Sequence, residues 1–333
     1  MSHSRVPQVL DRRLALELAR VTERAAVVAA RFRGRGDEQA ADEAALQAAH
    51  GVLAGMAIRG RVVIGEGLEG EVPHLFLGEE VGAGGDAVDL AVDPLEGATL
   101  CAKDMAGSIS VVVLAAPGSL LNAPPVYMEK VAIGPGYPDG IVSLAATPEE
   151  NIAALAKARG VPTSQITALV LDRPRHARLI ETVRSTGAAV KLITDGDVAG
   201  VIHTTNPTES GVDIYLGIGG AAEGVLAAAA LRCIGGQMEG RLVLDSEKKR
   251  EQAKALGIRD FGRVYKLDDM VRGDCLVAVT GVTDGPLLQG VRFSGDVIGT
   301  DTLLMRAATG TVRRIATDHR DLRKFHLSED VLP

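Results

Sequence analysis

The sequence of 333 residues contains no tryptophan, and aromatic residues make up only 3% of it. A core with so few aromatic rings must be filled by valine, leucine, isoleucine and alanine. Together with 39 glycines, this composition is typical of strands that alternate with helices and are joined by glycine turns. We therefore expect an α/β protein, and a chain of this length predicts two closely packed domains.

The chain also lacks a cysteine framework and any long apolar run. Its three cysteines, Cys101, Cys233 and Cys275, are widely spaced and form no zinc pattern. An odd number is a poor disulfide framework, so we expect reduced thiols in a cytoplasmic protein. No run is long enough to cross a membrane and the first residues carry no signal-peptide core, so no membrane partner is expected.

A basic surface is the third absence, because the formal net charge is -7. This excludes bulk nucleic-acid binding, which needs a strongly positive face. It does not exclude a small anionic substrate, since local arginines, lysines or a metal ion can dominate one pocket.

The apolar pattern predicts different textures in the two halves of the chain. In the first half we expect helices over 8–33, 38–56 and 148–159 and strands over 61–64, 75–77, 88–93 and 109–115. The segment 122–139 is rich in proline and glycine. The second half alternates strands over 166–171, 189–194 and 212–219 with helices over 176–187, 197–203 and 222–234. That alternation is typical of a parallel sheet with crossover helices. Beyond it we expect a helix over 246–257, a strand over 275–282 and strand pairs over 292–319. These textures predict an N-terminal domain, 1–164, and a C-terminal domain, 165–333.

The segment VDLAVDPLEGATL, residues 88–100, carries the most specific chemical pattern. An apolar strand runs into Asp93, and Pro94 is expected to end it there. Glu96 follows in a turn. Two carboxylates three residues apart repel each other in water, and such pairs are used where a hard divalent cation lies between them.

Three further acids stand at positions where a polypeptide commonly presents metal ligands. Asp42 lies in the first turns of a helix, Glu66 in the turn Gly65-Glu66-Gly67 after a strand, and Glu223 at the start of a helix. Oxygen ligands of this kind suit Mg²⁺ and Mn²⁺. Each acid alone is more often a solvated surface group, and Asp42 alone is better explained as a complement to the helix dipole.

The second-domain strands that end near 171, 194 and 219 bring basic and glycine-rich segments to one edge of the predicted sheet. Ligands of open α/β sheets bind outside these carboxyl ends. Arg173 and Arg175, together with a glycine-rich helix start, could bind phosphate there. Salt bridges to the helices explain the same arginines equally well. Tyr127 and Lys130 could reach the same ligand, although such residues usually lie on the surface.

Two other enzyme types are weakly indicated. The pattern Gly217-x-Gly219-x-x-Ala222 fits a permissive dinucleotide-binding fingerprint, but Glu223 in the first helical turn would repel a pyrophosphate. No nucleophile constellation is present, and the histidines at 50, 74, 176 and 203 are scattered, with none paired at metal spacing. Metal-activated water is therefore the expected attacking group.

Read together, these motifs resemble the class II fructose-1,6-bisphosphatases of bacteria, within the lithium-sensitive, Mg²⁺-dependent sugar phosphatase superfamily. The resemblance rests on GRGDEQAAD, VVIGEG, AVDPLEG, APPVYMEK, DRPRH, ITDGDVAG, GIGGAAEG and VTGVTDG, which follow that family's order and spacing from about residue 10 to about 320. It implies a layered α-β-α-β-α sandwich with the site between two domains.

The resemblance also implies the reaction and the residues that perform it. The reaction would be hydrolysis of the 1-phosphate of fructose 1,6-bisphosphate, with sedoheptulose 1,7-bisphosphate as the nearest related substrate, by a dimer or tetramer. The implied ligands of Mn²⁺ or Mg²⁺ are Asp42, Glu66, Asp93, Glu96 and Glu223. The implied substrate contacts are Glu96, Gly97, Ala98, Tyr127, Arg173, Pro174, Arg175, Asp195, Gly196, Asp197 and Gly220.

Two positions depart from the family pattern. Gly70 stands where the family has an aspartate, and Ala98 where it has a threonine. The family's aspartate and threonine are thought to orient and deprotonate the attacking water. Thr99, one residue further on, is the candidate replacement and joins Glu66 and Asp93 in the predicted catalytic set. Glu69 and Glu71 flank Gly70, but a shift of one residue reverses side-chain direction in an extended chain.

These departures leave an alternative to the sugar-bisphosphatase hypothesis. A divergent paralogue could have weak or altered phosphatase activity, or bind another phosphorylated metabolite with little turnover. A third hypothesis, an NAD-linked dehydrogenase, rests on Gly217–Ala222 alone.

Overall fold

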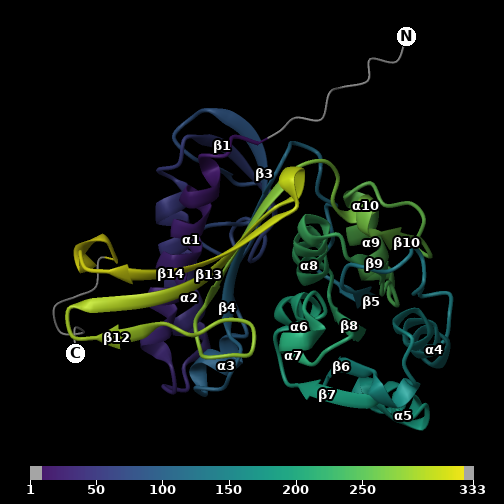
Figure 1. The fold of residues 1–333 in the computed structure, drawn as a ribbon. Coiled ribbons are helices and arrows are strands. Elements are labelled where there is room, and N and C mark those ends of the chain that lie inside the picture. Colours follow the sequence, from purple (N-terminus) through teal and green to yellow (C-terminus); the bar gives the residue numbers. More distant parts are fainter. Residues whose placement is uncertain (1–9, 326–333) are drawn as a thin grey trace. The chain divides into compact units, whose positions relative to one another are not determined.

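The computed structural model describes residues 10–325, which divide into two compact units (Figure 1). Unit 1 is formed by the chain up to Leu120 and from Arg272 onward, and unit 2 by Leu121–Val271. The domain boundary expected between residues 164 and 165 falls inside unit 2. Strand pairing explains the different division, because segments before that boundary join the sheet of unit 2 and the last strands join the sheet of unit 1.

Unit 1 contains a mixed sheet of eight strands in the order β12-β13-β11-β4-β3-β1-β2, with β14 paired to β13. The strands are β1 (Ile58–Ile64), β2 (Glu80–Val81), β3 (Asp86–Glu96), β4 (Ile109–Ala115), β11 (Cys275–Gly281), β12 (Arg292–Ser294), β13 (Val297–Arg306) and β14 (Thr311–His319). Strand β3 pairs in parallel with β1 and antiparallel with β4. The expected strand at 275–282 and the strand pairs over 292–319 are confirmed.

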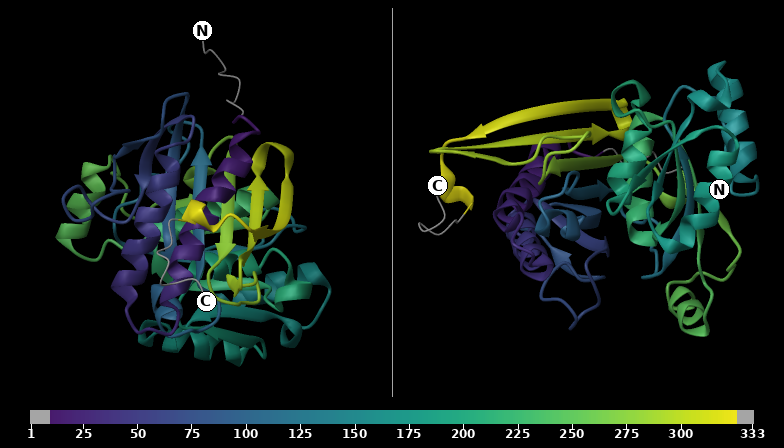
Figure 2. Two further views of the ribbon diagram at one scale, coloured as in Figure 1. Left: turned by 90° about the vertical axis from the view of Figure 1, so that its left-hand side faces the viewer. Right: turned by 90° about the horizontal axis from the view of Figure 1, so that it is seen from below.

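Two long helices, α1 (Leu14–Ala29) and α2 (Glu38–Leu53), pack on this sheet. A 3₁₀ turn, η1 (Ala30–Phe32), follows α1, and the short helix α3 (Ala98–Ala102) follows β3. The buried side chains of α1 meet those of β3, β4 and β11 in one aliphatic core, as the composition predicts. Both helices were expected. Residues 8 and 9 of the helix predicted over 8–33 lie outside the described part of the chain. Helix α2 ends at Leu53, three residues before the predicted end. Figure 2 shows both against the sheet.

The prediction that Pro94 ends the strand at Asp93 is wrong, because β3 continues to Glu96. Asp93 pairs with Val111 and Glu96 with Ile109, so three steps along β3 match two along β4. This register shift is a β-bulge, which accommodates a residue that cannot donate a ladder hydrogen bond. The proline therefore bends the strand without ending it.

The strand expected over residues 75–77 does not form. Leu75 is fully buried and has a positive φ of 53°, which is incompatible with an extended strand. Its burial explains the apolar pattern that suggested a strand. The segment is instead a compact loop between β1 and β2.

Unit 2 contains a six-stranded sheet in the order β10-β9-β5-β8-β6-β7. The strands are β5 (Tyr127–Ile133), β6 (Thr167–Leu171), β7 (Ala189–Ile193), β8 (Ile214–Gly220), β9 (Gln237–Leu242) and β10 (Val264–Lys266). Strands β8, β6 and β7 are parallel, as expected. Strand β5 lies in the Pro- and Gly-rich segment 122–139, where no strand was predicted, and it pairs antiparallel with β8 and β9.

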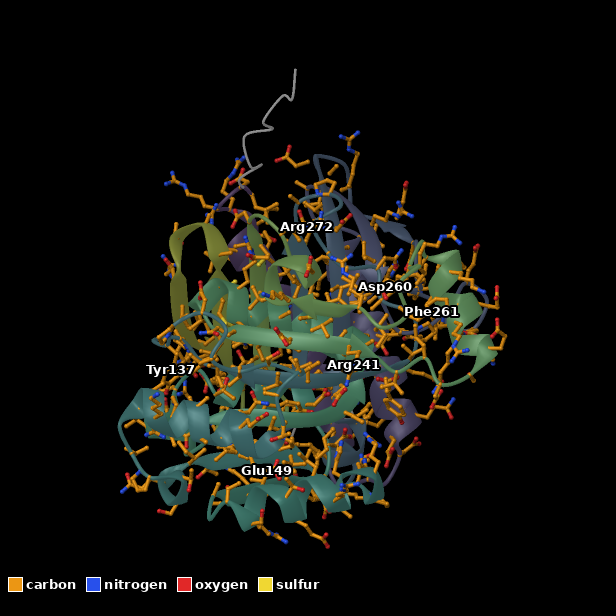
Figure 3. All side chains as sticks on the ribbon, turned by 90° about the vertical axis from the view of Figure 1, so that its right-hand side faces the viewer. Tyr137, Glu149, Arg241, Asp260, Phe261 and Arg272 are labelled. Carbon is orange, nitrogen blue, oxygen red and sulfur yellow. The ribbon has the colours of Figure 1, made fainter. Side chains whose placement is uncertain are left out.

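Helices cover both faces of this second sheet. The helices α4 (Pro148–Arg159) and α5 (Ala177–Ser185) share a core with Ile214 and Leu216 of β8. The alternate residue Tyr215 approaches α6 (Asp197–His203), which packs with α8 (Ala221–Ile234). A capping box between Thr147 and Glu150 starts α4, and Glu149 in its first turn complements the helix dipole (Figure 3).

The remaining helices of unit 2 are short: α7 (Pro207–Ser210), α9 (Glu247–Ala255) and α10 (Leu267–Met270), with 3₁₀ turns η2 (Thr163–Gln165) and η3 (Pro174–His176). In unit 1, η4 (Ala307–Thr309) and η5 (Leu322–Phe325) complete the described elements. Unit 1 thus supplies helix and sheet layers, and unit 2 supplies helix, sheet and helix layers, in agreement with an α/β sandwich. Within residues 10–325, no helix is both long and apolar enough to cross a membrane.

Replacing Leu114 by alanine tests the core of unit 1. Leu114 is fully buried in the central strand β4, so Leu114→Ala should lower the free energy of unfolding by about 2–5 kcal/mol. Leu16→Ala is the matched control, since Leu16 on α1 is 63% exposed and should change stability by less than about 0.5 kcal/mol. Equal effects in urea titrations of the two variants would contradict the placement of β4 in the core.

Candidate active site

Four of the five predicted metal ligands belong to unit 1, where β1 and β3 bring two of them side by side. The last residue of β1, Ile64, pairs in parallel with Ala91. Glu66 and Asp93 each lie two residues beyond this pair. Glu66 has left β1 and Asp93 is still within β3, so both stand near the carboxyl ends of neighbouring strands. Glu96 follows after the bulge and is buried, at 5% exposure, while Asp93 is half-buried.

The turn that presents Glu66 requires a glycine before it. A Cβ on Gly65 would lie 2.0 Å from the backbone oxygen of Leu75. The Glu66 amide donates to that same oxygen at 3.1 Å, and the Leu77 amide donates to the oxygen of Gly67 at 2.9 Å. The loop 65–77 therefore folds back on itself and fixes the backbone of Glu66.

Asp42 lies on helix α2, which packs against β3 and α3. Its carboxyl group is half-buried, and burial, assisted by the neighbouring charge of Glu43, raises its pKa above the usual range. A carboxylate that loses hydration in this way is stabilised in its charged form by a cation. The donor set of this part of unit 1 consists of carboxylate oxygens, which fits a hard divalent ion such as Mg²⁺ or Mn²⁺.

At the two positions that depart from the family pattern, Gly70 and Ala98, the residue present fits the local turn or the local packing. Gly70 has a φ of +88° in the turn that the hydrogen bond from the Glu71 amide to the Leu68 oxygen closes. An aspartate would be strained in this conformation. The carboxylate of Glu71 accepts from the Leu68 amide, and the methyl group of Ala98 packs against the hydrophobic core.

Thr99 differs from Ala98, because its hydroxyl makes a polar contact. It donates a hydrogen bond of 2.9 Å to Oε2 of Glu38, in the first turn of α2. Glu38 lies one helical turn before Asp42, so these two carboxylates lie on the same side of α2. Sequence reasoning missed Glu38. The four-residue spacing to Asp42 was a possible signal, but an exposed acid at a helix start is common.

In unit 2, the predicted substrate residues Tyr127 and Arg175 contact each other. The guanidinium of Arg175 lies 4.7 Å from the centre of the Tyr127 ring, and its Nε and Nη2 donate to the backbone oxygen of Ile218 at 3.0 and 2.7 Å. Nε2 of His176 accepts from the Ile218 amide at 2.8 Å. Residues that follow β6 therefore hold the end of the neighbouring strand β8.

A second cluster in unit 2 joins Asp197, Gly220 and Glu223 through Lys130. The ammonium group of Lys130 contacts the carboxylate of Asp197 and donates to the Gly220 oxygen at 2.8 Å. Lys130 is only 1% exposed, so its interpretation as a surface residue is wrong. Burial, followed by the charge of Asp197, raises the pKa of Glu223, and Lys130 opposes this shift.

Two glycines leave room for the acids of this cluster to pack directly against the backbone. A Cβ on Gly219 would lie 1.8 Å from Asp197, and a Cβ on Gly220 would lie 1.8 Å from Glu223. The pattern Gly219-Gly220 thus accommodates carboxylates, and the same glycines explain the permissive dinucleotide-like spacing. The remaining predicted residues, Arg173, Pro174, Asp195 and Gly196, follow the parallel strands β6 and β7 at this edge of the sheet.

The prediction that no histidines are paired at metal spacing is wrong. The rings of His50 and His74 stack with their centres 3.9 Å apart, although 24 residues separate them in the sequence. The loop between β1 and β2 folds back toward α2, which sequence spacing cannot reveal.

Comparison with known proteins shows the family to which the chain belongs. The profile of the family described as "Bacterial fructose-1,6-bisphosphatase, glpX-encoded" matches residues 12–319. The chain belongs to this family. Fructose-1,6-bisphosphatases of this family are phosphatases that hydrolyse a phosphoric monoester, and the expected family resemblance is confirmed.

Relatives within this phosphatase family match nearly the whole chain. Two proteins of Synechococcus sp., strains JA-3-3Ab and JA-2-3B'a(2-13), are named "D-fructose 1,6-bisphosphatase class 2/sedoheptulose 1,7-bisphosphatase" and are each 40% identical to it over 336 aligned positions. The "Fructose-1,6-bisphosphatase 1 class 2" of Escherichia coli strain K12 is 42% identical over 325. Each alignment covers 93% of this chain and 96% of the relative.

Replacing Lys130 by methionine tests the buried cluster of this phosphatase. The change leaves Asp197 and Glu223 without the buried ammonium group, so Lys130→Met should lower the free energy of unfolding by about 3–5 kcal/mol. Lys157→Met, at an exposed position of α4, is the control and should have little effect. Denaturant unfolding checks both variants. An unchanged free energy of unfolding in Lys130→Met would show that the cluster needs no positive charge.

Proposed function

We propose that this member of the fructose-1,6-bisphosphatase family hydrolyses the 1-phosphate of fructose 1,6-bisphosphate in the presence of Mg²⁺ or Mn²⁺. The observation that carries the proposal is the set of carboxylates at the carboxyl ends of β1 and β3. Sedoheptulose 1,7-bisphosphate is the second substrate to test, because the names of two relatives include it.

In the proposed site, carboxylates hold the metal ions. The proposed oxygen ligands are Asp42, Glu66, Asp93, Glu96 and Glu223. Bound there, the cations would neutralise charge on the phosphoryl oxygens and lower the pKa of the attacking water. The rigid loop at Gly65 and the bulge at Pro94 set the directions of the ligands in advance, which is how a protein fixes the geometry of such a site.

The phosphate and sugar groups would be bound by polar groups that the two sheets position. Arg173 and Arg175 offer guanidinium groups, and Arg175 is already oriented by the Tyr127 ring and the oxygen of Ile218. Asp195 and Asp197 can accept hydrogen bonds from sugar hydroxyls. The proposed contacts from the backbone are Gly97, Ala98, Pro174, Gly196 and Gly220.

Thr99 and Glu38 are the proposed pair that orients the attacking water. A hydroxyl that donates to a carboxylate keeps its lone pairs for a hydrogen bond from water. It can therefore hold the water in place and pass a proton on to the carboxylate. The hydrogen bond between Thr99 and Glu38 supports this role, and it accounts for turnover by a chain in which Gly70 and Ala98 offer no polar side chain.

The proposal extends to the setting of the enzyme. We place it in the cytoplasm, in carbohydrate metabolism, as a dimer or tetramer with a small-molecule substrate and no nucleic-acid partner. The buried state of Cys101, Cys233 and Cys275 as free thiols supports a reducing compartment.

The first test is phosphate release by the purified chain. With Mg²⁺ or Mn²⁺ it should release phosphate from fructose 1,6-bisphosphate, and EDTA should abolish the activity. Asp93→Asn should reduce kcat/KM by roughly 100-fold or more, because even partners of metal ligands contribute about 10–100-fold. Asp86→Asn, at the exposed start of the same strand, should not.

Failure to release phosphate from either bisphosphate with either metal would overturn the proposal. Equal activities of Asp93→Asn and Asp86→Asn would leave the reaction intact and remove Asp93 from the metal site.

The second test concerns the hydroxyl of Thr99. Thr99→Val removes it at nearly constant volume and should lower kcat by roughly 10²–10⁴-fold, with a much smaller change in KM. Thr99→Ser keeps the hydroxyl and should retain most of the rate, and Glu38→Gln should follow Thr99→Val. Steady-state kinetics with saturating Mg²⁺ checks all three variants; a kcat of Thr99→Val within threefold (roughly 0.7 kcal/mol) of the unmodified enzyme would assign the water to another group.

A further inference from the structure

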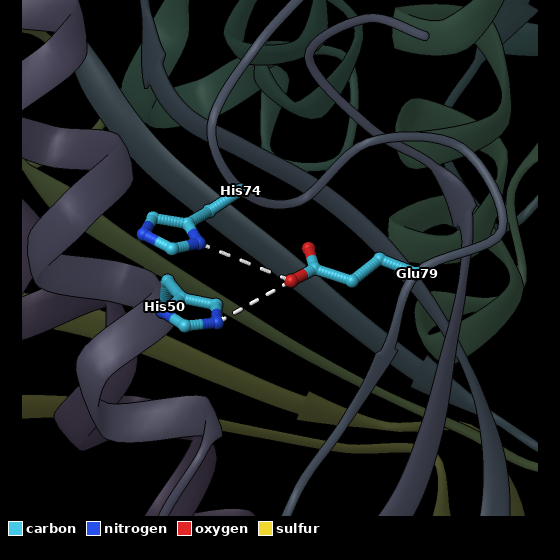
Figure 4. Close-up of side chains that lie close together, drawn as sticks. All are labelled: His50, His74 and Glu79. Carbon is cyan, nitrogen blue, oxygen red and sulfur yellow. Dashed lines mark ion pairs between the residues drawn. The ribbon is translucent and has the colours of Figure 1, made fainter. Parts of the chain in front are cut away.

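A cluster of two histidines and a glutamate lies outside the carboxylate set of the phosphatase. His50 is in the last turn of α2, and His74 and Glu79 are in the segment between β1 and β2. Figure 4 shows both imidazoles directed at the carboxylate of Glu79. Within residues 10–325, these three are the group whose side-chain ligand atoms all lie within 4.8 Å of one another.

The distances suit a small tetrahedral ion. Nε2 of His50 lies 3.4 Å from Oε1 of Glu79, and Nδ1 of His74 lies 4.0 Å from the same oxygen. Ligand atoms bound to zinc at about 2.0–2.1 Å in a tetrahedron are separated from one another by about 3.3–3.4 Å. The first of these distances already matches. The rings stack at an interplanar angle of 8°, so their nitrogens do not point at one common ion, and binding requires the ring of His74, which is 38% exposed and lies in a loop, to turn out of the stack as its Nδ1 moves closer.

The environment of His50 also favours metal binding. Two imidazolium rings stacked with 3.9 Å between their centres would repel each other. Burial and then His74 lower the pKa of His50, and Glu79 only partly opposes this shift. Neutral imidazole is the form that binds a metal ion.

The third ligand is oriented by the protein backbone. The other oxygen of the Glu79 carboxylate, Oε2, accepts from the Leu75 amide. The backbone of this segment is tied to β1, since the Val62 amide donates to the Glu79 oxygen at 2.9 Å and the Gly78 amide donates to the Val62 oxygen at 2.8 Å. Outer hydrogen bonds of this kind orient the carboxylate ligands of metal sites.

We propose that His50, His74 and Glu79 form a second metal site, which binds a divalent transition-metal ion such as Zn²⁺. Two nitrogen ligands and one carboxylate oxygen select such ions over Mg²⁺, which prefers oxygen ligands alone. A fourth position remains for water. The site would clamp the end of α2, which carries Asp42, to the loop that carries Glu66.

The experiment uses the full chain without a histidine tag, stripped with EDTA and then kept in excess Mg²⁺ to saturate sites made of oxygen ligands. Titration calorimetry with Zn²⁺ should give one equivalent bound with a micromolar or lower dissociation constant. Co²⁺ serves as the spectroscopic probe, and its visible absorption should intensify in a site of low coordination number. Both readouts are independent of phosphatase activity.

Matched variants assign the signal to these residues. His74→Ala and Glu79→Gln should weaken Zn²⁺ binding by at least about 10–100-fold and remove the Co²⁺ absorption. Glu80→Gln, at the exposed neighbour of Glu79, and Asp93→Asn, in the carboxylate set, should retain both. Circular dichroism checks that each variant is folded, and the exposed His74 can be removed without opening the core.

Three results would overturn the proposal: no tight Zn²⁺ binding by the unmodified protein, equal binding by folded His74→Ala, or loss of binding in Asp93→Asn. The first would make the cluster an ion pair only. The last would assign the zinc to the carboxylates.

Discussion

The position of strand β3 between β1 and β4 is the constraint on which the rest of unit 1 depends. Most of this strand is apolar and buried, and two of its acids, Asp93 and Glu96, lie near its carboxyl end. Parallel pairing with β1 brings a second strand end to the same place. Glu66, just beyond β1, and Asp93, near the end of β3, therefore lie toward the same end of the sheet, because the two strands run in the same direction.

Unit 2 also contains a cluster of acids. Its buried acids are accompanied by a resident cation, the ammonium group of Lys130, and by glycines that let carboxylates approach the backbone. The charge of Lys130 partly compensates Asp197 and Glu223 before any ligand binds. Lys130 reaches these acids because its strand, β5, pairs with β8, which ends at Gly220.

Local periodicity predicted most helices and the parallel part of the second sheet, since these depend on residues near one another in the sequence. It failed where tertiary contacts determine the backbone. Leu75 is apolar because it is buried in a loop, not because it belongs to a strand, and Pro94 continues a strand because a bulge accommodates it. The glycines around β5 concealed a strand whose partners lie about 90 and 110 residues later. For the same reason the family motifs indicated the acids of the site, whereas Glu38, the buried state of Lys130 and the histidine stack required coordinates.

The insertion of unit 2 within unit 1 has a consequence for protein synthesis. In unit 2 the Leu121 amide donates to the Met270 oxygen, and in unit 1 the Arg272 amide donates to the Ser119 oxygen, so in each unit the ends of the interruption are closed by a hydrogen bond. Strand β4 leaves the ribosome long before β11, its partner, is made. At a synthesis rate of about 5–20 residues per second, the edge of β4 remains unpaired for roughly ten to thirty seconds. Unit 2 is continuous and can fold during that interval, whereas unit 1 must keep an apolar strand edge from pairing with other nascent chains until the second half of its sheet emerges.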